Sequence, residues 1–399
     1  MANQTPFFSV VIPTKNRPVL LRDAILSVLW QDFTDFELII SDNHNDEQTQ
    51  LVLQEFESVP QVRIIKPSEE MKMIDHWEFA TSHSLGQYVI LLADRKVLYQ
   101  GALKKLKNNA QKYPNINAFS VGVQMYDEVN HKMGWCNAIG KTKQWKSSDL
   151  VSNFVNENLF SKKSYDIFFP KTLNGMYKNS FAKKVRDEFG HYFNTKGVTT
   201  PDYSSFFINT ALNDEIVYIG EKIILTQGER SSNGRIFGAG KFQSYMDSLG
   251  YEDPYKHVPI KAPVIYNLLV IDYLTIQDVV TNNPTRGNLN WFNYFKVNYF
   301  EILTKRNQGL DDEGFKYFTD AWEEGLLNTP VALDMGTVKE AALNELKINN
   351  EAIKHDKIKR LSHHTRDFLA VRFSKKSIMN KVFPFVFRDV FHAAGFNKT

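Results

Sequence analysis

Segments typical of strands and of helices alternate through the first hundred residues. Short runs rich in β-branched residues, typical of strands buried on both faces, are separated by segments with apolar residues at helical spacing. This order predicts a mainly parallel α/β sheet with helices on its faces. The expected strands are Phe8–Ile12, Phe36–Ile40, Val62–Ile65 and Tyr88–Leu92, and the expected helices are Pro18–Trp30, Glu47–Glu57 and Ile74–Ser84.

Polar residues follow three of the expected strands directly. The three segments are Pro13–Arg17, Ser41–Asp46 and Ala93–Lys96. Ligands of open parallel sheets bind beyond the carboxyl ends of the strands. We therefore expect the functional site where these three segments meet.

The later part of the chain is less regular. Two strands are expected at Ile216–Ile219 and Lys222–Leu225, joined at Gly220. A stretch rich in glycine and serine then predicts a loop, and the last third of the chain has a mainly helical pattern. The predicted division is an α/β domain over residues 1–240 and a mainly helical region over residues 241–399.

Charge and cysteine content exclude several classes of protein. The formal net charge of the 399 residues is only +3, which argues against a strongly basic nucleic-acid-binding protein. Cys136 is the single cysteine, so neither a disulfide framework nor a cysteine-based zinc site is expected. We find no signal-peptide pattern and no run of about 20 apolar residues that would span a membrane. These features predict a cytoplasmic protein.

The segment 357–399 is strongly basic. It holds ten Lys or Arg residues against two Asp, a balance of +8, and phenylalanines interleave the charges. Such a segment can dock peripherally on the anionic inner face of a membrane. Alternatively, it packs against the acidic body of its own chain.

Three motifs, in this order, resemble those of family 2 glycosyltransferases with the GT-A fold. Residues 8–17 are similar to the family's opening strand and its Pro-Thr-x-Asn-Arg loop. Residues 37–46 are similar to its apolar segment ending in Asp-x-x-x-Asp, and residues 86–94 to the strand before its acidic motif. The resemblance implies a Rossmann-like sheet and a nucleotide-sugar domain over residues 1–240.

The resemblance also implies an activity. It would be the inverting transfer of a sugar from a nucleotide-sugar donor, UDP-linked, to a hydroxyl of a saccharide or lipid-linked saccharide, as in bacterial surface polysaccharide biosynthesis. The alternative is an inactive protein that keeps the fold and binds nucleotide sugars or glycans. A nucleotidyltransferase is disfavoured because the loop Pro13–Arg17 has no glycine.

Several site residues follow from the resemblance. Asp42 would accept a hydrogen bond from the uracil ring nitrogen, and Arg17 could approach the diphosphate with its planar donor fork. The full nucleotide-sugar-binding set is Pro13, Thr14, Asn16, Arg17, Asp42, Asp94, Arg95 and Lys96.

The acidic motif departs from the family pattern. It has the sequence Asp94-Arg95-Lys96, so a lysine stands where the family has the carboxylate that binds Mg²⁺ or Mn²⁺. An ammonium cannot ligate a cation, which leaves Asp94 as the only metal candidate. Either Lys96, with Arg95, supplies the charge that a metal brings to the leaving diphosphate, or activity is lost. The first interpretation predicts an enzyme that requires no cofactor, and the less favoured alternative is dependence on Mg²⁺ or Mn²⁺.

A further motif, Thr199-Thr-Pro-Asp-Tyr203, resembles the segment that holds the family's acceptor-site acid. The proline predicts a helix start with Asp202 in its first turn. The resemblance makes Asp202 the general base, whereas the alternative is an acid that only complements the helix dipole. Further on, Arg230 is a candidate for phosphate binding.

Overall fold

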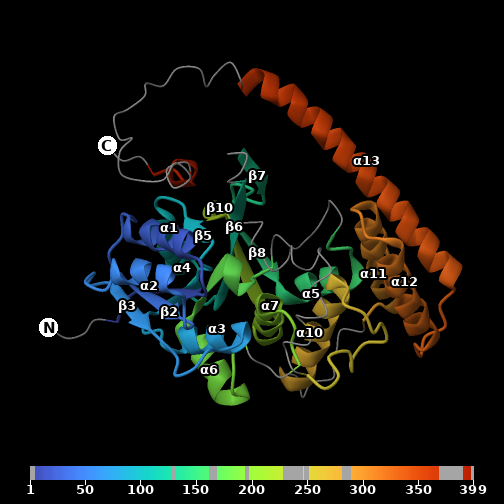
Figure 1. Cartoon of the computed structure of the whole chain (residues 1–399), viewed down its shortest axis with the longest axis horizontal. Helices are drawn as coiled ribbons and strands as arrows, with labels where there is room; N and C mark the ends of the chain where they lie inside the picture. The colour runs from blue at the N-terminus through green and yellow to red at the C-terminus, as the bar shows by residue number, and fades with distance from the viewer. Residues whose placement is uncertain are drawn as a thin grey trace.

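The structure is a computed structural model that describes residues 5–127, 132–160, 169–193, 197–227, 246, 251–280, 289–367 and 390–396. One sheet runs through its centre, helices cover both faces, and a group of C-terminal helices lies to one side (Figure 1).

Within the described residues, ten strands form the sheet. They are β1 (Phe8–Thr14), β2 (Phe36–Asp42), β3 (Val62–Ile65), β4 (Tyr88–Leu91), β5 (Lys96–Leu98), β6 (Ala118–Asp127), β7 (Lys132–Cys136), β8 (Lys143–Lys146), β9 (Gly175–Lys178) and β10 (Glu215–Thr226). The order is β3-β2-β1-β4-β9-β6-β10-β5, with β7 beside β6 and β8 beside β10. Strands β1 to β4 pair in parallel, as predicted. In contrast, β9 is antiparallel to both its neighbours.

Successive side chains of β1 point to opposite faces of the sheet, and each face is covered by its own layer of helices. Val10 and Ile12 face a cluster that contains helices α1, α2 and α4, whereas Val11 faces a cluster that contains α3, α5, α6 and α7. Because successive side chains of a strand point to opposite faces, both sides of the sheet are buried. The helices are α1 (Pro18–Leu29), α2 (Glu47–Gln54), α3 (Met73–Ser82), α4 (Ala102–Lys112), α5 (Ser147–Asn156), α6 (Asn179–Phe189) and α7 (Pro201–Leu212), with a short 3₁₀ turn at Thr172–Asn174.

The C-terminal helices share a core with the sheet layer. The ring of Tyr273 lies 5.5 Å from that of Phe154 in α5 and 5.3 Å from that of Phe207 in α7. The predicted helical character is confirmed for the described residues, whereas the expected boundary at residue 240 lies outside them. These helices are α10 (Ile265–Val280), α11 (Trp291–Asn307), α12 (Asp312–Leu327) and α13 (Met335–Asp367).

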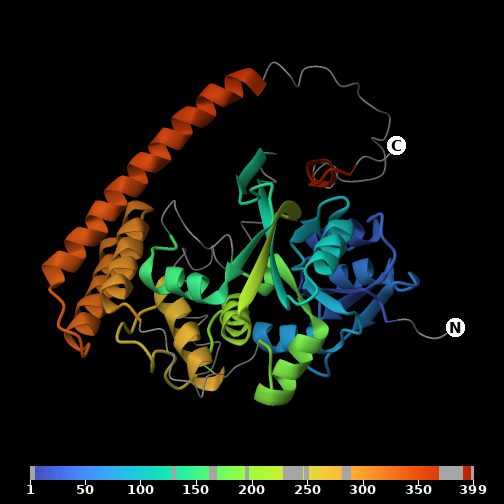
Figure 2. The same ribbon diagram turned by 180° about the vertical axis from the view of Figure 1, so that it is seen from behind.

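Helix α13 runs along one side of the molecule and continues past α11 and α12 (Figures 1 and 2). It includes the start of the basic segment 357–399, of which residues 368–389 and 397–399 lie outside the described residues. Both interpretations of that segment therefore stay predictions. No described helix combines the length and the apolar character that crossing a bilayer requires.

The strand pair expected around Gly220 is wrong. Residues 215–226 form one strand, β10, which runs parallel to β6 and shifts its register between Ile219 and Ile224. A Cβ atom at Gly220 would lie 2.2 Å from the carbonyl oxygen of Lys141. The glycine therefore permits a close backbone approach at an irregularity of the strand, not a reversal of the chain.

Residues 390–396 pack on the sheet beside α1. Phe391 is 5% exposed, and its ring centroid lies 4.7 Å from that of Trp30. The backbone N–H of Gln100 donates a hydrogen bond to the carbonyl oxygen of Ala394 at 3.0 Å. The contacts form a small apolar cluster that includes Val97 of β5. The end of the chain is thus attached beside the strand that begins at Lys96.

Replacing Phe391 tests this attachment. Phe391→Ala removes a buried ring, and we expect the free energy of unfolding to fall by about 3 kcal/mol in denaturant titrations. The control is His392→Ala at the exposed neighbouring position, which should change the free energy by less than about 0.5 kcal/mol. Equal effects of the two substitutions would contradict the packing.

Candidate active site

The three polar segments meet at one edge of the sheet, as expected from parallel strands. Pro13 and Thr14 end β1 and lie opposite Ser41 and Asp42 at the end of β2. The hydroxyl of Thr14 lies 3.4 Å from a carboxylate oxygen of Asp94, which follows β4. Three segments that are far apart in the sequence are thereby brought together.

Asp94 is buried against Arg17. The residue is 5% exposed, and its Oδ1 atom lies 3.0 Å from Nη1 of Arg17. Burial raises the pKa of Asp94, and the charge and hydrogen bond of Arg17 oppose this rise. Part of the Arg17 donor fork is therefore occupied by Asp94, which the sequence did not indicate.

Asp42 is held by hydrogen bonds on both carboxylate oxygens. Oδ1 accepts from the backbone and side-chain nitrogens of Asn45 at 2.8 and 2.6 Å, and Oδ2 accepts from Gln50 at 2.7 Å. Lys66 lies 3.3 Å from Oδ2. Burial opposes ionisation, yet the hydrogen bonds from Gln50 and Asn45 and the charge of Lys66 hold the pKa of Asp42 below its usual value. Asp42 is thus an ionised acceptor of fixed orientation.

The sequence analysis did not identify Lys66, although a signal for it was present. Lys66 directly follows β3, and the rule that singled out the residues after β1, β2 and β4 applies to this strand as well.

The loops after β1 and β2 are linked to each other. The backbone N–H of Asn16 donates to Oδ1 of Asn45 at 2.5 Å, and the backbone N–H of Asp46 donates to Oδ1 of Asn16 at 2.8 Å. Asn16 has a φ of 54°, in the left-handed region that asparagine tolerates better than most residues. The Asn16 side chain therefore shapes the loop itself.

Lys96, the last residue of the acidic motif, is buried. The residue is 4% exposed, and its Nζ atom donates to the carbonyl oxygen of Leu173 at 2.5 Å and to Oδ1 of Asn174 at 2.7 Å. Burial lowers the pKa of Lys96 well below its usual value; the charge of Arg95 lowers it further, and that of Asp202 raises it. The ammonium is short of anionic partners.

The acidic motif does not offer the donor set of a divalent cation. Mg²⁺ requires oxygen ligands, but Arg17 binds one oxygen of Asp94 and Lys96 occupies the position of the second acid. Within the described ranges, no group of three or more His, Cys, Asp or Glu residues is placed to hold a metal ion. These residues do not fit a resident Mg²⁺ or Mn²⁺.

Asp202 lies in the first turn of α7, as predicted from Thr200-Pro201. The residue is half-buried, and its backbone oxygen accepts a hydrogen bond from the hydroxyl of Ser205 at 2.6 Å. The charge of Asp202 raises the pKa of Lys96, against the larger effect of burial. Arg230 lies outside the described residues.

Two buried residues, Asp23 and Gln227, are linked to Arg95 by hydrogen bonds. Arg95 donates to the hydroxyl of Thr226 at 3.2 Å, and its backbone oxygen accepts from the N–H of Gln227 at 2.9 Å. Gln227 in turn donates from Nε2 to Oδ2 of Asp23, also at 2.9 Å. Among the described residues, Oδ1 of Asp23 and Oε1 of Gln227 lack hydrogen-bond partners. A proton on the Asp23 carboxyl could bridge these two acceptors.

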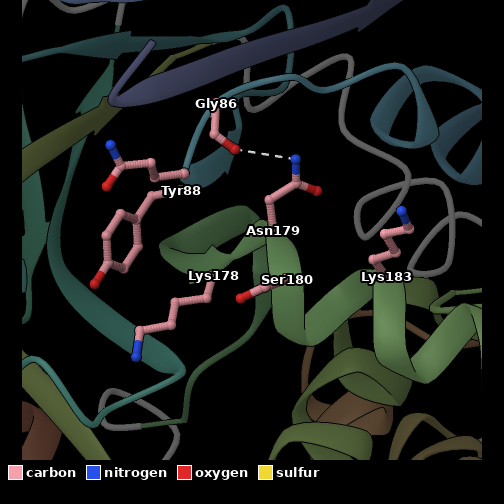
Figure 3. A pocket seen from close by; sticks show the side chains of 7 residues that line it. Gly86, Tyr88, Lys178, Asn179, Ser180 and Lys183 are labelled. Carbon is pink, nitrogen blue, oxygen red and sulfur yellow. Dashed lines mark hydrogen bonds between the residues drawn. The ribbon is translucent and has the colours of Figure 1, made fainter. Parts of the chain in front are cut away.

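A cavity of about 510 Å³ lies elsewhere, at the amino end of β4 (Figure 3). Lys178 and Lys183 line it, and Asn179 donates to the carbonyl oxygen of Gly86 at 3.0 Å. Because Asp42 and Asp94 lie at the carboxyl ends of their strands, this cavity is separate from the candidate site.

Comparisons with known proteins define the class. Residues 9–185 match the family described as Glycosyl transferase family 2. The chain is 31% identical over 238 residues to the GalNAc(5)-diNAcBac-PP-undecaprenol beta-1,3-glucosyltransferase of Campylobacter jejuni, covering 55% of this chain and 68% of that protein. The chain therefore belongs to glycosyltransferase family 2 and is a glycosyltransferase.

Solved structures give more distant likenesses. S. aureus TarS 1-349 is 13% identical, with a TM-score of 0.44 over 82% of this chain and 94% of that chain. The same protein in complex with UDP is also 13% identical, with a TM-score of 0.45 over 84% of this chain and 91% of that one. The family assignment rests on the sequence matches.

The Asp23–Gln227 pair predicts a pH-dependent stability. Burial raises the pKa of Asp23 to about 7, so the stability that this group confers falls as the pH rises towards 7 and is lost above it. The amide of Asp23→Asn cannot ionise and can donate to Gln227. We expect the variant to exceed wild type in unfolding free energy by up to about 3 kcal/mol at pH 8, and by much less at pH 5.

The control is Asp32→Asn, at an exposed position nine residues further on. Its difference from wild type should be the same at both pH values in denaturant titrations. A difference between Asp23→Asn and wild type that does not change from pH 5 to pH 8 would rule out a protonated Asp23.

Proposed function

We propose that this glycosyltransferase moves a sugar, with inversion, from a UDP-linked donor to a hydroxyl of a saccharide or lipid-linked saccharide in bacterial surface polysaccharide biosynthesis. The observation that carries the proposal is the convergence of Asp42 and Asp94 at the carboxyl ends of the parallel strands. Lys96 lies two residues after Asp94, and the charge of Asp202 acts on it. The Campylobacter jejuni relative, by its name a glucosyltransferase acting on an undecaprenol-linked saccharide, supports this acceptor class. The basic segment 357–399 would bring the enzyme to the anionic membrane surface that carries such acceptors.

Asp42 would recognise the base of the donor. An ionised carboxylate can accept about four hydrogen bonds. Asn45 and Gln50 donate three hydrogen bonds to the carboxylate of Asp42. The imide N–H of uracil donates a hydrogen bond, whereas the corresponding ring nitrogen of cytosine only accepts one. The charge state of Asp42 therefore favours a donor whose base has a ring N–H, such as a UDP-linked donor, over a CMP-linked one.

Asp202 would act as general base. Its carboxylate removes the proton from the acceptor hydroxyl while the oxygen forms a bond to the anomeric carbon. The bond from that carbon to the diphosphate oxygen breaks on the opposite face, and the electron pair leaves with the diphosphate. The configuration at the anomeric carbon is thereby inverted.

Lys96 and Arg95 would meet the charge of the leaving diphosphate. Burial without a full counter-charge lowers the pKa of Lys96, and a nearby anion raises the pKa of an amine. A bound diphosphate would therefore favour the protonated lysine. A charge of this kind, fixed before the reaction, stabilises a leaving group without reorganisation.

The first test of this mechanism is Asp202→Asn. We expect turnover, followed as UDP release, to fall at least about 100-fold because the amide cannot accept the proton. Thermal-shift titrations with UDP-, GDP-, CMP- and dTDP-linked sugars should still show binding of UDP-linked donors. The matched control is Asp214→Asn, at an exposed position beyond the other end of α7, with normal turnover. Normal turnover of Asp202→Asn would assign the base elsewhere.

A second test concerns the metal. We expect saturating EDTA to leave turnover within about twofold of the untreated enzyme, and Mn²⁺ not to raise it. Lys96→Gln keeps a donor for the Leu173 carbonyl but has no charge, so we expect turnover to fall at least about 10-fold, with folding checked by circular dichroism. Loss of activity in EDTA with recovery in Mn²⁺ would contradict the proposed role of Lys96.

A further inference from the structure

A buried carboxylate from the C-terminal helices holds the two residues that precede the helix of Asp202. Asp272 of α10 is fully buried. Its Oδ1 atom accepts from the backbone N–H of Thr199 at 2.5 Å and from the Thr199 hydroxyl at 2.9 Å. Its Oδ2 atom accepts from the backbone N–H of Thr200 at 2.8 Å and from the Thr200 hydroxyl. Four donors from two adjacent residues thus converge on one carboxylate.

We propose that Asp272 is a positioning residue that fixes Asp202 for proton removal; this inference rests on the proposed role of Asp202. One residue, Pro201, separates the bound Thr200 from Asp202. The proline ring fixes φ near −65°, so the path of the chain from Thr200 to Asp202 has little freedom. An error of about 1 Å in such a group can cost about 100-fold in rate.

The start of α7 shows that Asp272 replaces the usual local support. Thr200 is the residue at the N-cap, where a threonine side chain commonly accepts a hydrogen bond from its own helix. In the described part of the chain, the Thr200 side chain makes no such bond and donates to Asp272 instead. The first turn of α7 is thus anchored from α10, through a contact between residues 72 positions apart in sequence.

The geometry requires a carboxylate. Two carboxylate oxygens can accept all four hydrogen bonds, whereas an amide offers a single oxygen and turns its NH₂ group towards two donors. Burial raises the pKa of Asp272 to about 7, so the tests are made at pH 8, where the group is ionised. Asp272→Asn preserves the side-chain shape and removes half of the acceptors.

Glu301 of α11 provides a matched control. It is also a buried acid, 5% exposed, and it accepts from the backbone N–H groups of Ile265 and Tyr266 at 2.9 and 3.0 Å. It therefore supports the start of α10 in the way that Asp272 supports the start of α7. Glu301→Gln weakens a similar contact without touching residues 199–202.

The experiment compares Asp272→Asn with Glu301→Gln. We expect both variants to lower the melting temperature, but only Asp272→Asn to lower kcat, by about 10- to 100-fold, with the KM for the donor unchanged. Hydrogen exchange of peptides covering residues 197–212 should accelerate in Asp272→Asn alone. The double variant Asp202→Asn/Asp272→Asn should be no slower than Asp202→Asn, because Asp272 acts through Asp202.

If Asp272→Asn fails to fold, the Thr200 hydroxyl gives the same test. Thr200→Val removes one hydrogen bond to Asp272 and should lower kcat, whereas Thr200→Ser keeps the hydroxyl and should retain it. A kcat equal to that of wild type in the folded Asp272→Asn variant, or in Thr200→Val, would overturn the positioning role while Asp202→Asn stays inactive. Normal turnover of Asp202→Asn would instead overturn the proposed base and, with it, the role of Asp272.

Discussion

Burial of both faces of the parallel strands is the constraint on which the site depends. Apolar residues alternate to the two helical layers along β1, so polar groups can gather only where the strands end. Charges collected at such an edge must compensate one another, because an unpaired buried charge is costly. The contacts of Arg17 with Asp94 and of Lys66 with Asp42 meet this requirement. The architecture and the electrostatics of the site therefore have one origin.

The sequence predicts the first hundred residues well because their periodicity is local. Each strand and helix there is indicated by residues a few positions apart, and the rule for strand ends brings Thr14, Asp42 and Asp94 together. The interpretation of Gly220 was wrong because a glycine between two apolar runs is compatible with a turn and with an irregular strand. The pairing of β10 with β6 and the Lys141 carbonyl beside Gly220 distinguish the two, and neither contact is local.

The partners of the charged side chains could not be predicted, for the same reason. Lys96 is bound by Leu173 and Asn174, which are 77 and 78 positions away, and Asp23 is bound by Gln227, which is 204 positions away. A single sequence holds no signal for such distant pairs. A charged residue among the apolar positions of a helix, as at Asp23, is nevertheless a sign that a buried partner exists. Asp272, within the apolar helix α10, gives the same indication of a buried partner.

The hydrogen bonds between α10 and residues 199–200 have a consequence for the exchange of parts among related enzymes. A chimera that joins the α/β layer of this chain to the helical region of a relative without an aspartate at this position would break the contacts with Thr199 and Thr200. Transplanting α7 alone would separate it from the same carboxylate. The two threonines and the aspartate thus form a unit that must be exchanged together, although the threonines precede α7 and the aspartate lies in α10. We expect recombination to be tolerated where both sides of that unit come from the same parent.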